Sequence, residues 1–127
     1  MTDPDAIYRA RLVRSVKGMI RFAERRQAVR ETKGKAGVAV TITEQQAEAL
    51  LAKAGYCCAL TGLRFWTDTG LHSYGPMSPT FDRIEHAGPY SQANLRVVLS
   101  GVNAMRGSGS DADMYRIAGA LVLRAPS

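Results

Sequence analysis

The sequence predicts an α+β fold in one compact unit, with a small strand–strand–helix core between a long basic helix and a shorter amphipathic helix. Two short β-type runs, residues 80–84 and 95–99, stand on either side of a polar turn, and a helical segment follows the second run. Apolar residues at helical spacing recur near both ends of the chain. A length of 127 residues suits one domain with a small core.

The N-terminal segment, residues 1–37, predicts a long basic helix followed by a break. Asp3 and Pro4 mark its start, because an aspartate side chain caps free backbone N–H groups and proline fits the first helical turn. Apolar side chains then follow the spacing of one helix face, at Leu12, Val16, Met19, Ile20 and Ala23. We expect the helix over about residues 4–31 and a polar break over residues 32–37.

Residues 38–127 are expected to form the strand–strand–helix domain. Its first segment, residues 38–42, is rich in β-branched side chains and predicts a strand or an extended stretch. Thr43 and Gln46 then form the pattern of a capping box, which indicates the start of a short helix. Gly55 fits the end of that helix, because glycine adopts the left-handed backbone conformation that often follows a last turn.

The later part of this domain predicts one loop and one further helix. Residues 67–78 form a polar loop, and Phe65 and Trp66 are expected to lie in the core beneath it. Ser110 with Asp113 repeats the capping pattern at the start of a C-terminal helix. The apolar face of that helix consists of Met114, Ile117, Ala118, Leu121 and Val122.

Charge is concentrated at the N-terminal end of the chain. Residues 1–35 hold ten basic and four acidic residues, so their net charge of +6 equals that of the whole chain. A basic stripe of this kind is typical of a polyanion-binding surface, whereas a solvated helix face is the alternative reading.

Composition excludes several classes of protein. No apolar run approaches the roughly 20 residues that cross a bilayer, so no membrane association is expected. The N-terminus lacks the pattern of a secretion signal. The two cysteines, Cys57 and Cys58, are adjacent, and adjacent cysteines rarely pair, so a reduced, cytoplasmic protein is expected.

Oxygen-bearing side chains recur through the strand–strand–helix segment. Asp82 lies in the first β-type run, Asn94 directly precedes the second run, and Asn103 lies in the helical segment. Carboxylate and amide oxygens suit Mg²⁺ or Mn²⁺ better than zinc. Two protein ligands suffice, because Mg²⁺ retains waters and accepts phosphate oxygens. Taken singly, these residues also fit a surface ion pair and two turn or cap residues.

The stretch PTFDRIEHAGPYSQANLRVVLSGVNAMR resembles the HNH endonuclease family, most closely its phage and prophage branch, in which DRI stands where most members have DHI. The resemblance covers roughly residues 38–123. It implies a ββα-metal core in which Asp82 and Asn103 bind the catalytic metal and Asn94 holds the first strand and the base in register. It further implies cleavage of double-stranded DNA, in the cytoplasm of a bacterium that hosts a phage or prophage.

Arg83 is the main departure, since a histidine at this position serves as the general base in most members of the family. Arginine stays protonated and cannot accept a proton. Arg83 is therefore expected to act by its charge on the scissile phosphate, with the water activated by the metal or by His86. His72 and Glu85 are alternative bases, and binding of nucleic acid with little catalysis is a further alternative.

Other positions complete the expected site. The expected contacts to DNA are basic residues of the helix and of the core, namely Arg14, Lys17, Arg21, Arg25, Arg64, Arg96 and Arg106. In GYCCALTGLRF, Cys58 and Thr61 occupy positions that form a C-x-x-C zinc knuckle in other members of the family. Because Thr61 replaces the second cysteine and no second C-x-x-C follows, a structural zinc is not expected.

Three functions therefore compete. The first is a metal-dependent DNA endonuclease, with the N-terminal helix wrapped around the site and the C-terminal helix closing it. The second is a nucleic-acid-binding module of the same fold with a degenerate site. The third is a protein-interaction domain whose basic helix docks an acidic partner; nothing in the sequence supports a homo-oligomer.

Overall fold

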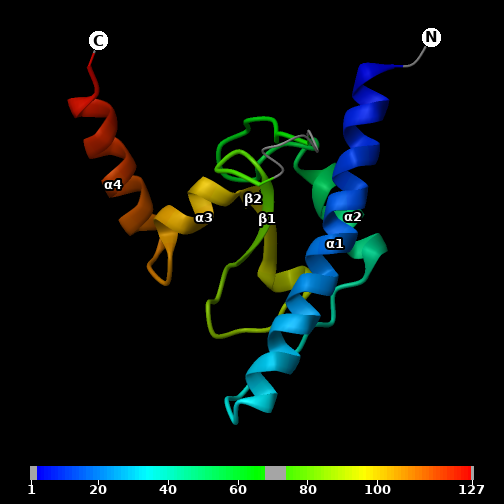
Figure 1. Cartoon of the computed structure of the whole chain (residues 1–127). Coiled ribbons are helices and arrows are strands. Elements are labelled where there is room, and N and C mark those ends of the chain that lie inside the picture. The colour runs from blue at the N-terminus through cyan, green and yellow to red at the C-terminus, as the bar shows by residue number, and fades with distance from the viewer. Residues whose placement is uncertain (1–2, 68–73, 127) are drawn as a thin grey trace.

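The computed structural model describes residues 3–67 and 74–126. Within these ranges the chain is α+β, as the sequence predicts, with helices and a two-stranded antiparallel sheet (Figure 1). The order along the chain is α1 (Pro4–Thr32), α2 (Glu44–Lys53), β1 (Pro79–Arg83), the 3₁₀ turn η1 (Gln92–Asn94), β2 (Leu95–Leu99), α3 (Ser100–Arg106) and α4 (Asp111–Arg124). None of the helices in the described ranges has the length and apolar character needed to cross a membrane.

Helix α1 begins and ends as its sequence predicts. The Asp3 carboxylate accepts a hydrogen bond from Asp5 N at 3.0 Å, and Gly34, with φ of 72°, follows the last turn. Its buried face consists of Leu12, Val16, Ile20, Ala23 and Gln27. Met19, which the sequence assigns to the same face, is partly buried at its edge.

Helix α2 packs against α1, β2 and η1. Thr43 and Gln46 form the predicted capping box, and Gly55 has a φ of 65°, as expected for a residue after a helix end. The preceding segment, residues 38–42, is extended rather than a regular strand, because Val40 makes an isolated bridge to Tyr90.

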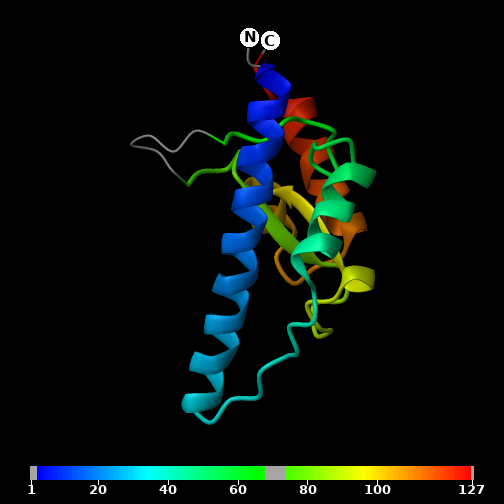
Figure 2. The same cartoon turned by 90° about the vertical axis from the view of Figure 1, so that its right-hand side faces the viewer.

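The sheet pairs β1 with β2 in the register that places Asp82 opposite Arg96. Val98, Leu99 and Phe81 from the two strands join residues of α1 and α2 in one core. The two views show α1 along one side of the sheet and α3 and α4 on the other side (Figures 1 and 2).

The prediction that Phe65 and Trp66 both lie in the core is right for the first and wrong for the second. Phe65 is 3% exposed, whereas Trp66 is 64% exposed. Trp66 N donates a hydrogen bond to Met77 O at 2.9 Å, so the backbone here is extended and successive side chains point to opposite sides. Burial of Phe65 therefore turns the Trp66 ring outward.

Helix α4 forms as predicted but does not cover the site. Ser110 and Asp113 make the expected capping box, and Met114 is buried. The rest of the apolar face is open, because Ile117, Leu121 and Val122 are 48%, 58% and 74% exposed. Beyond its first turn the helix extends away from the sheet (Figure 1), so the expectation that it closes the site is wrong.

Candidate functional site

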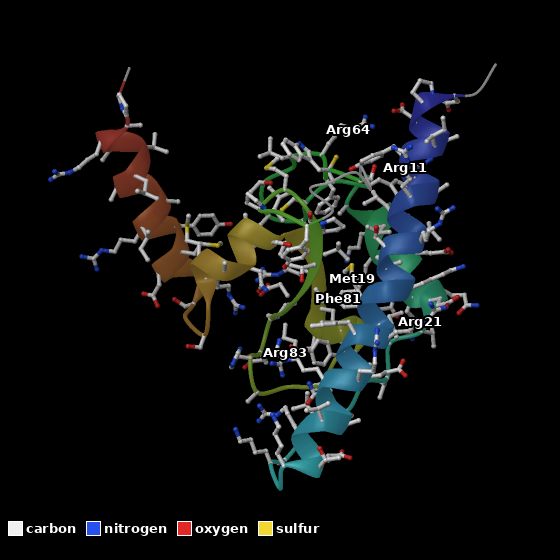
Figure 3. The ribbon with its side chains drawn as sticks, viewed as in Figure 1. Arg11, Met19, Arg21, Arg64, Phe81 and Arg83 are labelled. Atoms are coloured by element: carbon white, nitrogen blue, oxygen red, sulfur yellow. The ribbon has the colours of Figure 1, made fainter. Side chains whose placement is uncertain are left out.

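A groove of about 600 Å³ lies between the C-terminal part of α1, the end of β1 and α3. Asp82 and Arg83 of β1, His86 of the following turn and Asn103 of α3 all line it. The structure thus brings together both predicted metal ligands, the unusual arginine and one candidate base. Figure 3 shows Arg83 beyond Phe81 along β1, nearer the C-terminal end of α1.

The Asp82 carboxylate is buried and held by two arginines. Asp82 is 2% exposed, and strand pairing places it directly across the sheet from Arg96. Oδ2 accepts hydrogen bonds from Arg96 Nη2 at 2.6 Å and from Arg96 Nε at 3.0 Å. Oδ1 accepts one from Arg106 Nη1 at 2.9 Å. A carboxylate can stay ionised at this depth only if such partners replace its lost hydration.

Asp111, at the start of α4, completes a network of four charges. Arg96 donates to both of its carboxylate oxygens, at 2.9 and 3.0 Å. These hydrogen bonds hold the pKa of Asp111 below its usual range and raise the pKa of Arg96 above its usual range. Arg106 Nε lies 2.9 Å from Asp111 Oδ1, although its N–H is not directed at that oxygen. Two carboxylates and two guanidinium groups leave the network formally neutral.

Arg106 also ties α3 to the end of β1. Its guanidinium donates to Arg83 O at 2.9 Å and to Ile84 O at 2.7 Å. The side chains of Arg96 and Arg106 are 17% and 7% exposed. These two residues, which the sequence assigns to DNA contact, are therefore engaged with Asp82, Asp111 and backbone carbonyls and offer little surface to a phosphate.

Oxygen donors remain on the groove side despite this network. A carboxylate oxygen has two lone pairs, and Asp82 Oδ1 accepts only one hydrogen bond from the described residues. The Asn103 amide makes no side-chain hydrogen bond within residues 3–67 and 74–126 and lines the same groove as Asp82. The donor types fit Mg²⁺ or Mn²⁺.

The protein supplies only a small part of a metal shell. Over the described ranges, no group of three or more His, Cys, Asp or Glu side chains could hold an ion. A divalent ion at Asp82 and Asn103 would therefore take most of its ligands from water and from a bound phosphate, which Mg²⁺ readily does.

Arg83 is oriented by the turn that follows β1. Its Nη1 donates to Gly88 O at 3.1 Å, and its guanidinium carbon lies 4.8 Å from the centre of the Tyr90 ring. The hydrogen bond uses one of five guanidinium N–H groups. Of the alternative bases, His86 lines the groove and is exposed and Glu85 is exposed, while His72 falls outside the described residues.

Asn94 fixes the shape of the same turn. Its Oδ1 accepts from Glu85 N at 2.8 Å, while its Nδ2 donates to Glu85 O at 3.1 Å and to Pro89 O at 2.9 Å. A Cβ at Gly88 would lie 2.7 Å from Asn94 Nδ2, so the turn requires glycine there. Asn94 is placed to hold β1, the turn and β2 in register, which is the role that the family resemblance implies.

The basic residues predicted on α1 face away from the groove. Positions 14, 17, 21 and 25 share one helix face, centred roughly 180° round the helix from positions 26, 27 and 30, which line the groove. Arg21 lies on the opposite side of α1 from Met19 (Figure 3), and Lys17 pairs with Glu44 at 3.8 Å. Arg26 and Arg30, which the sequence reading omitted, line the groove instead.

Arg64 lies near the N-terminal end of α1 (Figure 3). It pairs with Asp5 at 3.2 Å and stacks over the Tyr8 ring at 4.1 Å. It does not line the groove that holds Asp82. Its predicted contact with DNA stays a prediction, on a surface separate from the candidate site.

Comparison of the chain with family models, with curated proteins and with solved structures finds no match. Assignment to the HNH family therefore rests on the motif and on the placement of its residues. It stays a proposal.

Proposed function

We propose that this protein is a metal-dependent DNA endonuclease with an HNH-type site. The observation that carries the proposal is that Asp82 of a strand and Asn103 of the following helix line one groove. Arg26, Arg30 and Arg83 line the same groove, so a phosphate backbone would find positive charge beside the oxygen donors. The strand–turn–strand–helix order agrees with the family layout.

The chain's own residues suggest a division of labour at the phosphodiester bond. Mg²⁺ or Mn²⁺ held by Asp82 Oδ1 and the Asn103 amide oxygen would supply Lewis acidity at the phosphate and the leaving oxygen. Arg83 lines the groove, makes one side-chain hydrogen bond among the described residues, and would stabilise negative charge that develops on a phosphate oxygen. Arg96 and Arg106 would hold the Asp82 carboxylate in place through the reaction.

Arg83→Ala is expected to lower the cleavage rate by about 10²-fold, because the lost contact strengthens in the transition state. Arg83→Lys should retain part of the activity, since lysine keeps the charge but loses the planar fork. The rate of single-turnover plasmid cleavage measures both effects. A fully active Arg83→Ala would make Arg83 a bystander.

His86→Ala is the matched test of the rival base. If His86 accepts the proton from the attacking water, its loss should slow cleavage by roughly 10²- to 10⁴-fold. If His86→Ala cleaves as fast as wild type, proton transfer does not depend on this imidazole.

The salt dependence of DNA binding should reveal which face of α1 contacts phosphates. Arg26→Gln/Arg30→Gln removes two charges on the groove side, and Arg21→Gln/Arg25→Gln removes two on the outer face. We expect the first pair to reduce the slope of log K against log salt by about two and the second pair to change it little. The opposite result would favour the outer stripe that the sequence suggests.

A nucleic-acid-binding module with a degenerate site is the second candidate. The specific observation in its favour is that three arginine N–H groups already engage the Asp82 carboxylate. Incubation of supercoiled plasmid with Mg²⁺, Mn²⁺ or a chelator separates the two candidates. Binding without metal-dependent nicking or linearisation would support the module.

A further inference from the structure

A second groove, of about 700 Å³, lies beside the first between α1 and the sheet. Five aromatic side chains line it, namely Phe22 of α1, Trp66 and Tyr74 of the connecting segment, Phe81 of β1 and Tyr90 of the following turn. Figure 3 shows where α1 crosses the strand, with Met19 beside Phe81. The groove thus places rings from distant parts of the sequence on one surface.

Three of these rings are strongly exposed. Phe22, Trp66 and Tyr74 are 61%, 64% and 73% exposed. A single exposed apolar side chain is ordinary, but rings gathered in one concave surface mark a binding site. The three rings expose a large apolar surface, which a flat ligand would cover.

The aromatic groove continues into the groove that holds Asp82. Arg26, Phe81, Tyr90 and Asn103 line both of them. Beyond these shared residues, the second half adds Arg30 and Arg83. The surface is therefore one trough with an aromatic half and a basic half, and Asn103 lies where they meet.

We propose that the aromatic half binds unpaired bases of single-stranded or locally opened nucleic acid, while the basic half binds the adjoining backbone. This inference rests on the proposed function for the identity of the partner. Base faces stack on aromatic rings with little regard to sequence, and positive charge alongside tracks the phosphates. A paired duplex keeps its base faces stacked inside and would offer the rings no such surface.

The positive charge of the basic half argues against an apolar protein as the partner. An apolar peptide would cover the rings but would leave Arg26, Arg30 and Arg83 without a counter-charge. A single strand supplies both chemistries along one chain. The substrate of the proposed endonuclease would then be DNA that has an unpaired stretch next to the cleaved bond.

Trp66 is the only tryptophan of the chain, so tryptophan fluorescence reports on this groove alone. Short oligothymidylate is titrated in the presence of a chelator, with an abasic strand of the same length and charge as the matched ligand. We expect oligothymidylate to quench the Trp66 fluorescence and to bind roughly 5- to 100-fold more tightly than the abasic strand.

Three variants test whether oligothymidylate binds in the trough. Phe22→Ala should weaken binding of oligothymidylate roughly 5- to 100-fold without changing the affinity for the abasic strand, and Phe22→Tyr should restore it. Tyr115→Ala removes a ring that is 58% exposed on α4, on the other side of the sheet, and should change neither affinity. Since Phe22 is itself exposed, its replacement should leave the fold intact.

The inference would be overturned if oligothymidylate and the abasic strand bound with equal affinity and Trp66 fluorescence were not quenched. It would also be overturned if Phe22→Ala lost the same affinity for both strands. Weakening by Tyr115→Ala as large as that by Phe22→Ala would also overturn it. Because no metal is present, these results are independent of cleavage. The endonuclease proposal is tested separately, and it fails if supercoiled plasmid stays intact when metal is present.

Discussion

Replacement of Asp82 by alanine is expected to abolish cleavage and also to destabilise the fold by about 3–5 kcal/mol. The carboxylate is 2% exposed and receives hydrogen bonds from both Arg96 and Arg106. Its removal leaves two largely buried guanidinium groups that, among the described residues, share only Asp111 as a counter-charge. The free energy of unfolding in urea, measured for wild type and variant, gives the size of this effect.

Asp111→Asn is the matched control for Asp82→Ala. Asp111 binds the same two arginines but its side chain is 39% exposed, so solvent screens its interactions and a smaller loss is expected. Because the Arg96 hydrogen bonds lower the pKa of Asp111, its contribution is present above its ordinary pKa and is lost as the pH falls through the folded-state pKa. Wild-type stability in Asp82→Ala would contradict the importance of the buried network.

Asn103→Ala is expected to lower cleavage by at least about 10²-fold, as loss of a group that stabilises the transition state does. Its effect on stability should stay within about 0.5 kcal/mol. The Asn103 side chain makes no hydrogen bond to any other residue of the described ranges, so its loss leaves no partner unsatisfied. Cleavage rate and unfolding free energy, measured on the same preparation, test both parts.

Asn94→Ala, unlike Asn103→Ala, should lower the stability of the fold. It loses three hydrogen bonds that close the turn after β1, so a clear fall in unfolding free energy is expected. If Asn103→Ala cleaves as fast as wild type, Asn103 has no part in metal binding. If it unfolds as readily as Asn94→Ala, its role is structural.

Local chemistry was sufficient to predict the elements of this fold. The Asp3–Pro4 start and the two capping boxes depend on residues three or fewer apart, so helices α1, α2 and α4 follow from the sequence alone. The strands are likewise found within one residue of the predicted runs. The sequence also indicated Asp82, Arg83, His86 and Asn103, which line one groove.

Local sequence patterns could not predict the contacts between segments that are distant in the chain. The pairing of Asp82 with Arg96 depends on strand register, and Asp111 joins them from the next helix. The face of α1 that meets the sheet decides that Arg26, rather than Arg21, lines the groove. The apolar residues Leu63, Phe65 and Trp66 do not alternate with polar ones, so the sequence did not indicate which of them is buried.

The apolar face of α4 shows another limit of sequence patterns. Helical spacing correctly predicts the amphipathic helix, yet Leu121 and Val122 remain exposed. Periodicity reports which side chains share a face but not whether another element covers that face.

Metal-dependent cleavage by the intact chain tests the central claim most directly. Chelator-treated protein is incubated with supercoiled plasmid, Mn²⁺ or Mg²⁺ is then added back, and Asn103→Ala purified in parallel controls for a contaminating nuclease. We predict no cleavage with chelator, nicking or linearisation after addition of metal, and at least about 10²-fold slower cleavage by the variant. Tight DNA binding with intact plasmid at every metal concentration would contradict the assignment of an endonuclease.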